Sequence, residues 1–161
     1  MHAKTAVPSA VTLRQLKRGD RDAVLAIEQD GFPTSTLHFT FYDHLEDADS
    51  FGIVAVEEKR VLAYMLYEDV DDQIYLSELA VAKQARRRGI GRMLVTWLIE
   101  QLPQYRRDRI ELDVFKENAN AIALYRSLGF KPAPELSGRR TMTMQYKRQS
   151  TARRRKKRLS T

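Results

Sequence analysis

Cysteine is absent from the 161 residues of this chain. Its absence excludes disulfide bonds, cysteine nucleophiles and zinc sites built on cysteine. No apolar run approaches the ~20 residues of a membrane-spanning helix, and the opening stretch MHAKTAVPSA lacks the apolar segment of a secretory signal. The three histidines, at positions 2, 38 and 44, do not have metal-ligand spacing, so no metal site is predicted. We therefore expect a cytoplasmic protein without a membrane partner.

The basic residues are unevenly distributed. The net charge is +7, yet residues 148–161 hold seven Lys and Arg and no acid, so the rest of the chain is neutral. With 43% hydrophobic and 30% charged residues, that remainder has an ordinary globular composition. We predict a single domain over residues 1–147 and a flexible basic tail over 148–161. The tail predicts weak, salt-sensitive contact with a polyanion or the ribosome, or a solubilising end without a specific role.

Residues 76–102 predict a strand, a basic glycine-containing turn and a helix. The turn is Arg86-Arg87-Arg88-Gly89-Ile90-Gly91, and apolar residues at helical spacing follow it. The first amides of a helix have no internal partner and lie at the positive end of its dipole. Glycine has no Cβ, so the backbone can approach a ligand closely. The guanidinium of arginine has several N–H donors in a plane, which match the oxygens of a phosphate. This pattern indicates a phosphate or pyrophosphate site at the turn.

Three phosphate-binding patterns were compared with this turn. The Gly-x-x-x-x-Gly-Lys-Ser/Thr pattern of a P-loop is absent, and Leu94 stands where a dinucleotide-binding turn needs its third glycine. The pattern Arg/Gln-x-x-Gly-x-Gly/Ala after a strand is matched by Arg86 to Gly91. That string resembles the acetyl-CoA motif of the GNAT superfamily of N-acetyltransferases.

A second string in the right order supports this resemblance. Residues 110–130 contain Asn118-x-x-Ala121, then Tyr125, then Gly129-Phe130. This segment is similar to the branch of the superfamily that acetylates protein N-termini, typified by the enzyme acting on a ribosomal protein. The resemblance extends over roughly residues 11–146.

Periodicity and turn signals predict an α+β fold with a mixed sheet of six or seven strands and about four helices. Because a helix separates the strands at 74–81 and 109–115, we expect these two to be parallel. The resemblance implies that the rest of the sheet is mostly antiparallel and that this central pair splays apart. Strands are expected at 11–16, 51–56, 61–67, 74–81, 109–115 and 141–146, and helices at 20–29, 35–45, 91–102 and 118–128. The strands at 51–56 and 61–67 are expected to form a hairpin. Asp20 and Asn118 are candidate N-caps of the helices that they begin, and Gly129 suits the position after a helix end.

Acetyl-CoA is the co-substrate that the resemblance implies. In the family, the amides of the turn cradle the pyrophosphate, and the preceding strand pairs with the pantetheine arm. The corresponding cofactor-binding residues here are Leu79, Ala80, Val81, Arg86, Arg87, Arg88, Gly89, Ile90, Gly91, Arg92, Asn118, Ala121 and Tyr125.

Two residues match catalytic positions of the family. Tyr125 occupies the place of the general acid, and a phenol of pKa ~10 is protonated at neutral pH. Asp113 lies where the ribosomal-protein branch has a glutamate base, and its side chain is one methylene shorter. A solvent-facing carboxylate is the alternative interpretation of Asp113, and Glu78 is a second candidate base.

The predicted function is direct transfer of an acetyl group to a primary amine, with a protein N-terminal α-amine as the favoured acceptor. An α-amine, with a pKa of ~8, is partly neutral at pH 7, whereas a lysine amine at ~10.4 needs a stronger base. The alternatives are a small-molecule amine acceptor and a non-catalytic module that binds CoA or RNA.

Overall fold

The computed structural model describes residues 10–31 and 37–149, with side chains left undescribed at 37–39. The start of the predicted helix at 35–45 and most of the predicted basic tail lie outside these ranges. The chain divides into two compact units, one of Met1–Leu66 and Glu78–Leu94, the other of Tyr67–Ser77 and Val95–Thr161. Each unit is built from segments that are separate in the sequence, because the chain passes from one to the other more than once.

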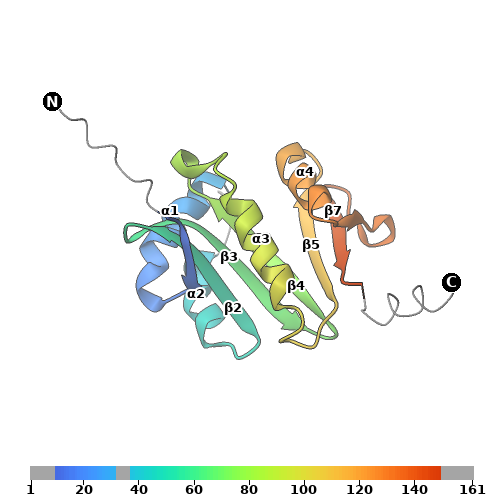
Figure 1. Ribbon diagram of the computed structural model, residues 1–161, viewed down its shortest axis with the longest axis horizontal. Coiled ribbons are helices and arrows are strands. Elements are labelled where there is room, and N and C mark those ends of the chain that lie inside the picture. The colour runs from blue at the N-terminus through green and yellow to red at the C-terminus, as the bar shows by residue number, and fades with distance from the viewer. Residues whose placement is uncertain (1–9, 32–36, 150–161) are drawn as a thin grey trace, which may run out of the picture. The chain divides into compact units, whose positions relative to one another are not determined.

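Seven strands form one mixed sheet in the order β1-β2-β3-β4-β5-β7-β6 (Figure 1). The predicted α+β fold is confirmed, and every predicted strand and helix is present within a few residues of its expected bounds. The short strand β6 completes the sheet. The strands are β1 Thr12–Gln15, β2 Ser50–Glu57, β3 Arg60–Val70, β4 Gln73–Val81, β5 Arg109–Phe115, β6 Lys131–Pro132 and β7 Thr141–Lys147; the α-helices are α1 Arg21–Gly31, α2 Leu37–Glu46, α3 Ile90–Gln101 and α4 Ala119–Ser127.

The strand β5 has a parallel neighbour on one side and an antiparallel neighbour on the other. Ile74–Leu76 of β4 pair in parallel with Ile110–Leu112, as α3 between the two strands predicts. All of β5 pairs with β7 in antiparallel register, from Arg109 opposite Lys147 to Phe115 opposite Thr141. Alternate residues of β5 are buried, so Ile110, Leu112 and Val114 face one way and Glu111, Asp113 and Phe115 the other.

The hairpin of β2 and β3 turns through two residues that are not glycine. Glu58 and Lys59 have φ angles of 47° and 67°. Two positive φ angles in a two-residue loop are the requirement of a type I′ turn, which normally recruits Asn-Gly. The predicted hairpin is therefore correct, and its backbone is held in the left-handed region without the residues that favour it.

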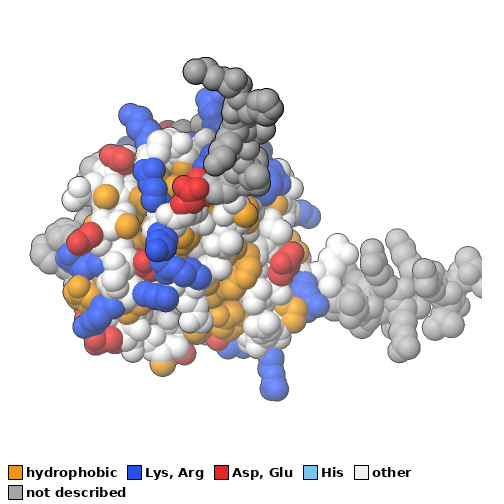
Figure 2. All heavy atoms as spheres, turned by 60° about the vertical axis from the view of Figure 1, so that its left-hand side comes forward, with side chains coloured by type: hydrophobic (Ala, Val, Ile, Leu, Met, Phe, Trp, Pro, Cys, Tyr) orange, Lys and Arg blue, Asp and Glu red, His pale blue; other side chains and the backbone are white. Residues whose placement is uncertain are grey.

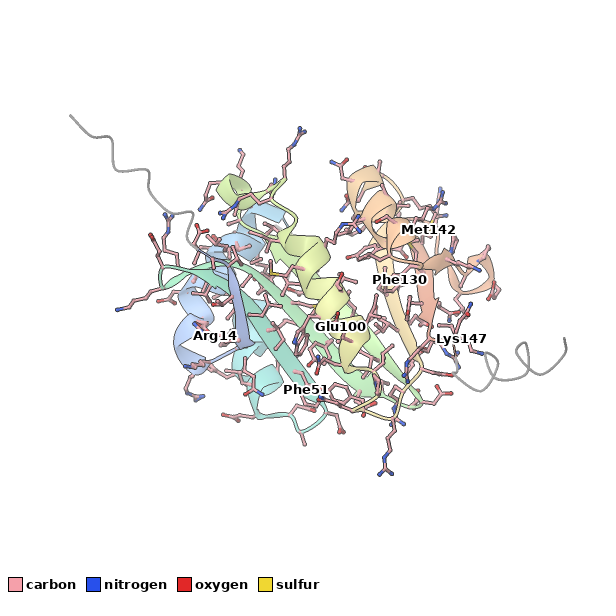
Figure 3. The ribbon with its side chains drawn as sticks, in the orientation of Figure 1. Arg14, Phe51, Glu100, Phe130, Met142 and Lys147 are labelled. Carbon is pink, nitrogen blue, oxygen red and sulfur yellow. The ribbon has the colours of Figure 1, made fainter. Side chains whose placement is uncertain are left out.

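The role predicted for Asp20 differs from the one in the structure. We expected Asp20 to cap the N-terminus of α1, but it ends a short 3₁₀ helix, Arg18–Asp20, that runs directly into α1. Its carboxylate accepts two hydrogen bonds of 2.8 Å from the guanidinium of Arg14 on β1 (labelled in Figure 3) and one of 2.8 Å from the Lys17 amide. Asp20 is only 7% exposed, so a charged partner outside its helix determines its position.

The helix α4 has both of the end signals that the sequence predicted. At its start, the Asn118 side chain accepts a hydrogen bond of 3.2 Å from the Ala121 amide. At its end, Gly129 has φ +98°, and the amides of Gly129 and Phe130 bond to the carbonyls of Arg126 and Tyr125 at 3.1 and 3.0 Å. These two bonds form a Schellman motif, which places Phe130 next to the last turns of the helix.

On the face drawn in Figure 2, Lys and Arg side chains project from the surface at separate points, with Asp and Glu side chains between them. Among residues 10–31 and 37–149, no helix is long and apolar enough to cross a membrane.

Candidate functional site

The turn that follows β4 has the geometry of an anion site. Gly89 is exposed, has φ +77°, and a Cβ added there would meet nothing within 4 Å. The Gly89 carbonyl accepts the Met93 amide at 3.0 Å as α3 begins, so the amides that precede Met93 in the first turn have no partner within the helix. Ile90 is 2% exposed and anchors the start of α3 in the core. The first-turn amides of Ile90 and Gly91, which lack a partner within the helix, the positive end of the helix dipole and open space therefore coincide at this point.

The arginines of the turn have different partners. Arg86 donates from Nε to the Val81 carbonyl at 3.3 Å, which links the end of β4 to the loop. Arg88 donates from both terminal nitrogens to the carboxylate of Glu57 at the end of β2. Arg87 is exposed and has φ 64°. Two of the three guanidinium groups thus bind protein atoms.

The Glu57–Arg88 contact is a charged pair with matched forks. The hydrogen bond from Arg88 holds the pKa of Glu57 below its usual value, and the same bond raises the pKa of Arg88. Both groups are therefore ionised at neutral pH. The side chain of Glu57 is 20% exposed and that of Arg88 is 41% exposed. Solvent therefore weakens the attraction between the charges, while the two hydrogen bonds still fix their relative orientation.

The other residues of this unit that are predicted to bind the cofactor lie at the end of a strand and in the first turn of a helix. Leu79, Ala80 and Val81 form the half-buried end of β4, and half-buried Gly91 and exposed Arg92 belong to the first turn of α3. The extended backbone of β4 thus leads through the basic loop into the first turn of a helix, as the motif requires.

The phenol of Tyr125 is buried within the second unit. Tyr125 lies on α4 with 7% of its surface exposed, and its ring is 5.6 Å from that of Phe130, which in turn lies 5.6 Å from Tyr146 of β7 (Phe130 is labelled in Figure 3). Burial raises the pKa of Tyr125 to about 12. The hydroxyl therefore keeps its proton across the physiological pH range.

Asp113 is held by hydroxyl groups from both neighbouring strands. Tyr75 on β4 donates to Oδ2 at 2.8 Å, and Thr143, opposite Asp113 on β7, donates to Oδ1. Thr143 is 2% exposed, whereas Asp113 itself is exposed. Burial and the Asp113 contact together raise the pKa of Tyr75, which remains a neutral donor. The carboxylate is thus fixed in orientation and open to solvent.

Glu78, the second candidate base, also has a tyrosine partner. The buried Tyr64 of β3 donates a hydrogen bond of 2.8 Å to Oε2 of Glu78. Burial, followed by the charge of Glu78, raises the pKa of Tyr64. Each candidate base therefore accepts a bond from a phenol that stays protonated.

The predicted site residues fall into two groups. Those at 78–92 belong to the first unit, and Asp113, Asn118, Ala121 and Tyr125 belong to the second. No motif in the sequence marks the partners Glu57, Tyr75, Thr143 and Tyr64. The pairing of β5 with its neighbours, once known, predicts the first contacts of Asp113, because opposite and diagonal residues of a sheet meet.

Comparison with known proteins identifies the family. Residues 20–130 match the acetyltransferase (GNAT) family. The chain is 33% identical over 122 residues to a ribosomal protein bS18-alanine N-acetyltransferase of Salmonella typhimurium, covering 76% of this chain and 82% of that protein.

Solved structures give the same result. The crystal structure of the ribosomal-protein alanine N-acetyltransferase of Escherichia coli has a TM-score of 0.76 and 28% identity, covering 88% of this chain and 96% of that one. PaiA N-acetyltransferase of Thermoplasma acidophilum, solved in complex with coenzyme A, shares the fold with a TM-score of 0.73 and 14% identity, covering 86% and 99%. The resemblance to the ribosomal-protein branch and the assignment as an N-acetyltransferase enzyme are confirmed. This chain belongs to the acetyltransferase (GNAT) family.

Proposed function

We propose that this acetyltransferase uses acetyl-CoA and transfers the acetyl group directly to the α-amine of a protein N-terminus. The turn at Arg86–Arg92 carries the proposal, because the start of a helix, an open glycine at φ +77° and a basic loop fit a diphosphate. The relative from Salmonella typhimurium, named for acetylating an alanine of a ribosomal protein, supports the acceptor. PaiA, whose structure contains coenzyme A, supports the co-substrate.

The proposal gives each residue predicted to bind acetyl-CoA a defined role. The amides from Gly89 to Arg92 hold the diphosphate, and the backbone of Leu79–Val81 pairs with the pantetheine arm. Asn118, which caps α4, and Ala121 and Tyr125 on that helix are proposed to contact the thioester end. Bound acetyl-CoA supplies an acetyl group already activated for attack by an amine.

Tyr125 is the proposed general acid. As the new C–N bond forms and the C–S bond breaks, the phenol donates its proton to the departing sulfur. A pKa of about 12 keeps the phenol protonated before each turnover. Its ring is buried and packs next to Phe130, which fixes the position of the ring before transfer.

Asp113 is the proposed acceptor of the proton that the amine loses. Tyr75 and Thr143 each donate to one of its oxygens, leaving further lone pairs on both, and its exposure gives access to water. A water molecule between Asp113 and the amine compensates for the short aspartate side chain. An α-amine of pKa ~8 requires only modest assistance at pH 7, which suits a solvent-exposed carboxylate.

The test is a thiol-release assay with matched peptides. One peptide has a free N-terminal alanine and no lysine, and its partner has a blocked N-terminus and one internal lysine; a polyamine and free amino acids complete the panel. We expect CoA release and a mass gain of one acetyl group on the first peptide alone. Transfer only to the lysine peptide or to small amines refutes the acceptor, and no release with any amine refutes the acetyl-transfer proposal.

A further inference from the structure

Glu57 lies at the end of β2, outside both sequence motifs, and its carboxylate binds the guanidinium of Arg88 through two hydrogen bonds. Resting on the proposed function above, we propose that this ion pair positions the diphosphate-binding turn, so that Glu57 is a positioning residue for acetyl-CoA. Arg88 immediately precedes Gly89, whose amide and those that follow are the proposed ligands of the diphosphate. A restraint on Arg88 is therefore a restraint on the direction of these amides.

The backbone on both sides of the pair shows why such a restraint is needed. Glu57 precedes Glu58 and Lys59, which have φ angles of 47° and 67°, and Arg88 follows Arg87, which has φ 64°. Residues with a Cβ avoid this left-handed region, and they remain in it only where the surrounding contacts hold them there. The ion pair therefore links the turn at Glu58 and Lys59 to the turn at Arg87, because Glu57 and Arg88 are the residues adjacent to these turns.

The geometry of the contact distinguishes positioning from direct phosphate binding. Each terminal nitrogen of Arg88 donates to a different oxygen of Glu57, so the planar fork is matched and its orientation is fixed. The glutamate neutralises the charge that Arg88 would otherwise offer to a phosphate. At the other end of the loop, the bond from Arg86 Nε to the Val81 carbonyl holds the backbone from the strand side. The loop is therefore anchored at both ends by arginines that do not themselves need to touch the ligand.

Calorimetric titration with acetyl-CoA tests the proposal on Glu57→Gln, Arg88→Gln and the double variant. Glu58→Gln is the matched control, since it removes the same charge one residue away on the same turn. Partly exposed ion pairs contribute up to ~1 kcal/mol, so we expect each single variant to bind acetyl-CoA about two- to fivefold more weakly. The double variant is expected to be no weaker than the singles, and the control is expected to bind like the wild type.

A second readout separates positioning from general destabilisation. With a demonstrated acceptor, we expect the variants to have a higher KM for acetyl-CoA than the wild type and a kcat within about twofold of it. The reason is that an interaction of equal strength in the ground state and the transition state changes KM and not kcat. For S-acetylpantetheine, which lacks the diphosphate, KM is expected to be unchanged. Thermal unfolding of each variant checks that the fold is retained, and Arg88→Lys, which keeps the charge but loses the fork, replaces any variant that does not fold.

Three results overturn the inference. Tighter binding by Glu57→Gln with weaker binding by Arg88→Gln shows that Arg88 contacts the phosphate itself. Additive losses show that the two residues act independently, and unchanged affinity in both shows that the pair does not restrain the site. If the wild-type protein fails to bind acetyl-CoA, the proposed function itself fails, and that outcome is seen before any variant is compared.

Discussion

Replacing Gly89 by aspartate or asparagine isolates the charge of the ligand that the turn binds. The two side chains have the same shape, and both tolerate the left-handed backbone better than other residues with a Cβ do. A Cβ at Gly89 meets nothing within 4 Å, so there is room for the first side-chain atom of either residue. The pair therefore differs by one negative charge placed where we propose that the diphosphate lies.

The expected magnitude follows from Coulomb's law. Two like charges 4 Å apart repel by about 1 kcal/mol in bulk water and about 4 kcal/mol at an effective dielectric constant of 20. Because Gly89 is exposed, the value near the lower end applies. A repulsion of about 1–2 kcal/mol makes acetyl-CoA binding by Gly89→Asp about five- to thirtyfold weaker than by Gly89→Asn.

Calorimetry at two salt concentrations measures this difference. We expect the Asp and Asn variants to differ most at low ionic strength and to converge as salt screens the repulsion. Binding of S-acetylpantetheine, which has no diphosphate, serves as the control and is expected to be the same in both. Equal affinity for acetyl-CoA at low salt in the two variants contradicts the placement of the diphosphate at this turn.

Three further predictions concern the acid, the packing and the pH dependence of stability. Tyr125→Phe keeps the ring next to Phe130 and removes the proton donor. We expect kcat to fall by at least about a hundredfold, with little change in the affinity for acetyl-CoA. An unchanged kcat would exclude the role of Tyr125 as general acid. Gly52→Ala places a Cβ 2.6–2.7 Å from side-chain atoms of Leu16. We expect this variant to unfold at a lower denaturant concentration than the wild type. An unchanged unfolding midpoint would contradict the packing of β2 against Leu16. The bond from Arg14 lowers the pKa of Asp20 in the folded protein. Its contribution to the free energy of unfolding is therefore complete above the unfolded-state pKa of ~3.9 and is lost as pH falls through the lower folded value. Asp20→Asn is expected to make the free energy of unfolding less dependent on pH in acid, and acid unfolding curves identical to those of the wild type would refute this prediction.

Residues close together in the chain gave the most accurate sequence predictions. The cap at Asn118, the positive φ of Gly129 and the open glycine that precedes α3 each depend on a few adjacent residues. The two strings that define the family are local for the same reason, since a turn or a helix end is specified within about one helical turn of sequence. Helix and strand bounds followed from periodicity, which is also local.

Contacts between distant segments required the tertiary structure. Glu57 and Arg88 are 31 residues apart in the sequence, and Asp113 and Thr143 are 30 apart. No motif in the sequence identifies Glu57 or Thr143 as the partner. Asp20 was misassigned because its charged partner, Arg14, lies on another element that only folding brings near.

The sequence by itself determined the family and the order of the elements, because both are encoded by short, local patterns; the same patterns predict the residues that we propose bind acetyl-CoA. The tertiary structure alone decided which arginine of the turn is neutralised, which hydroxyls orient Asp113 and how deeply Tyr125 is buried. These properties depend on strand register and side-chain packing, where a shift of one residue changes every partner.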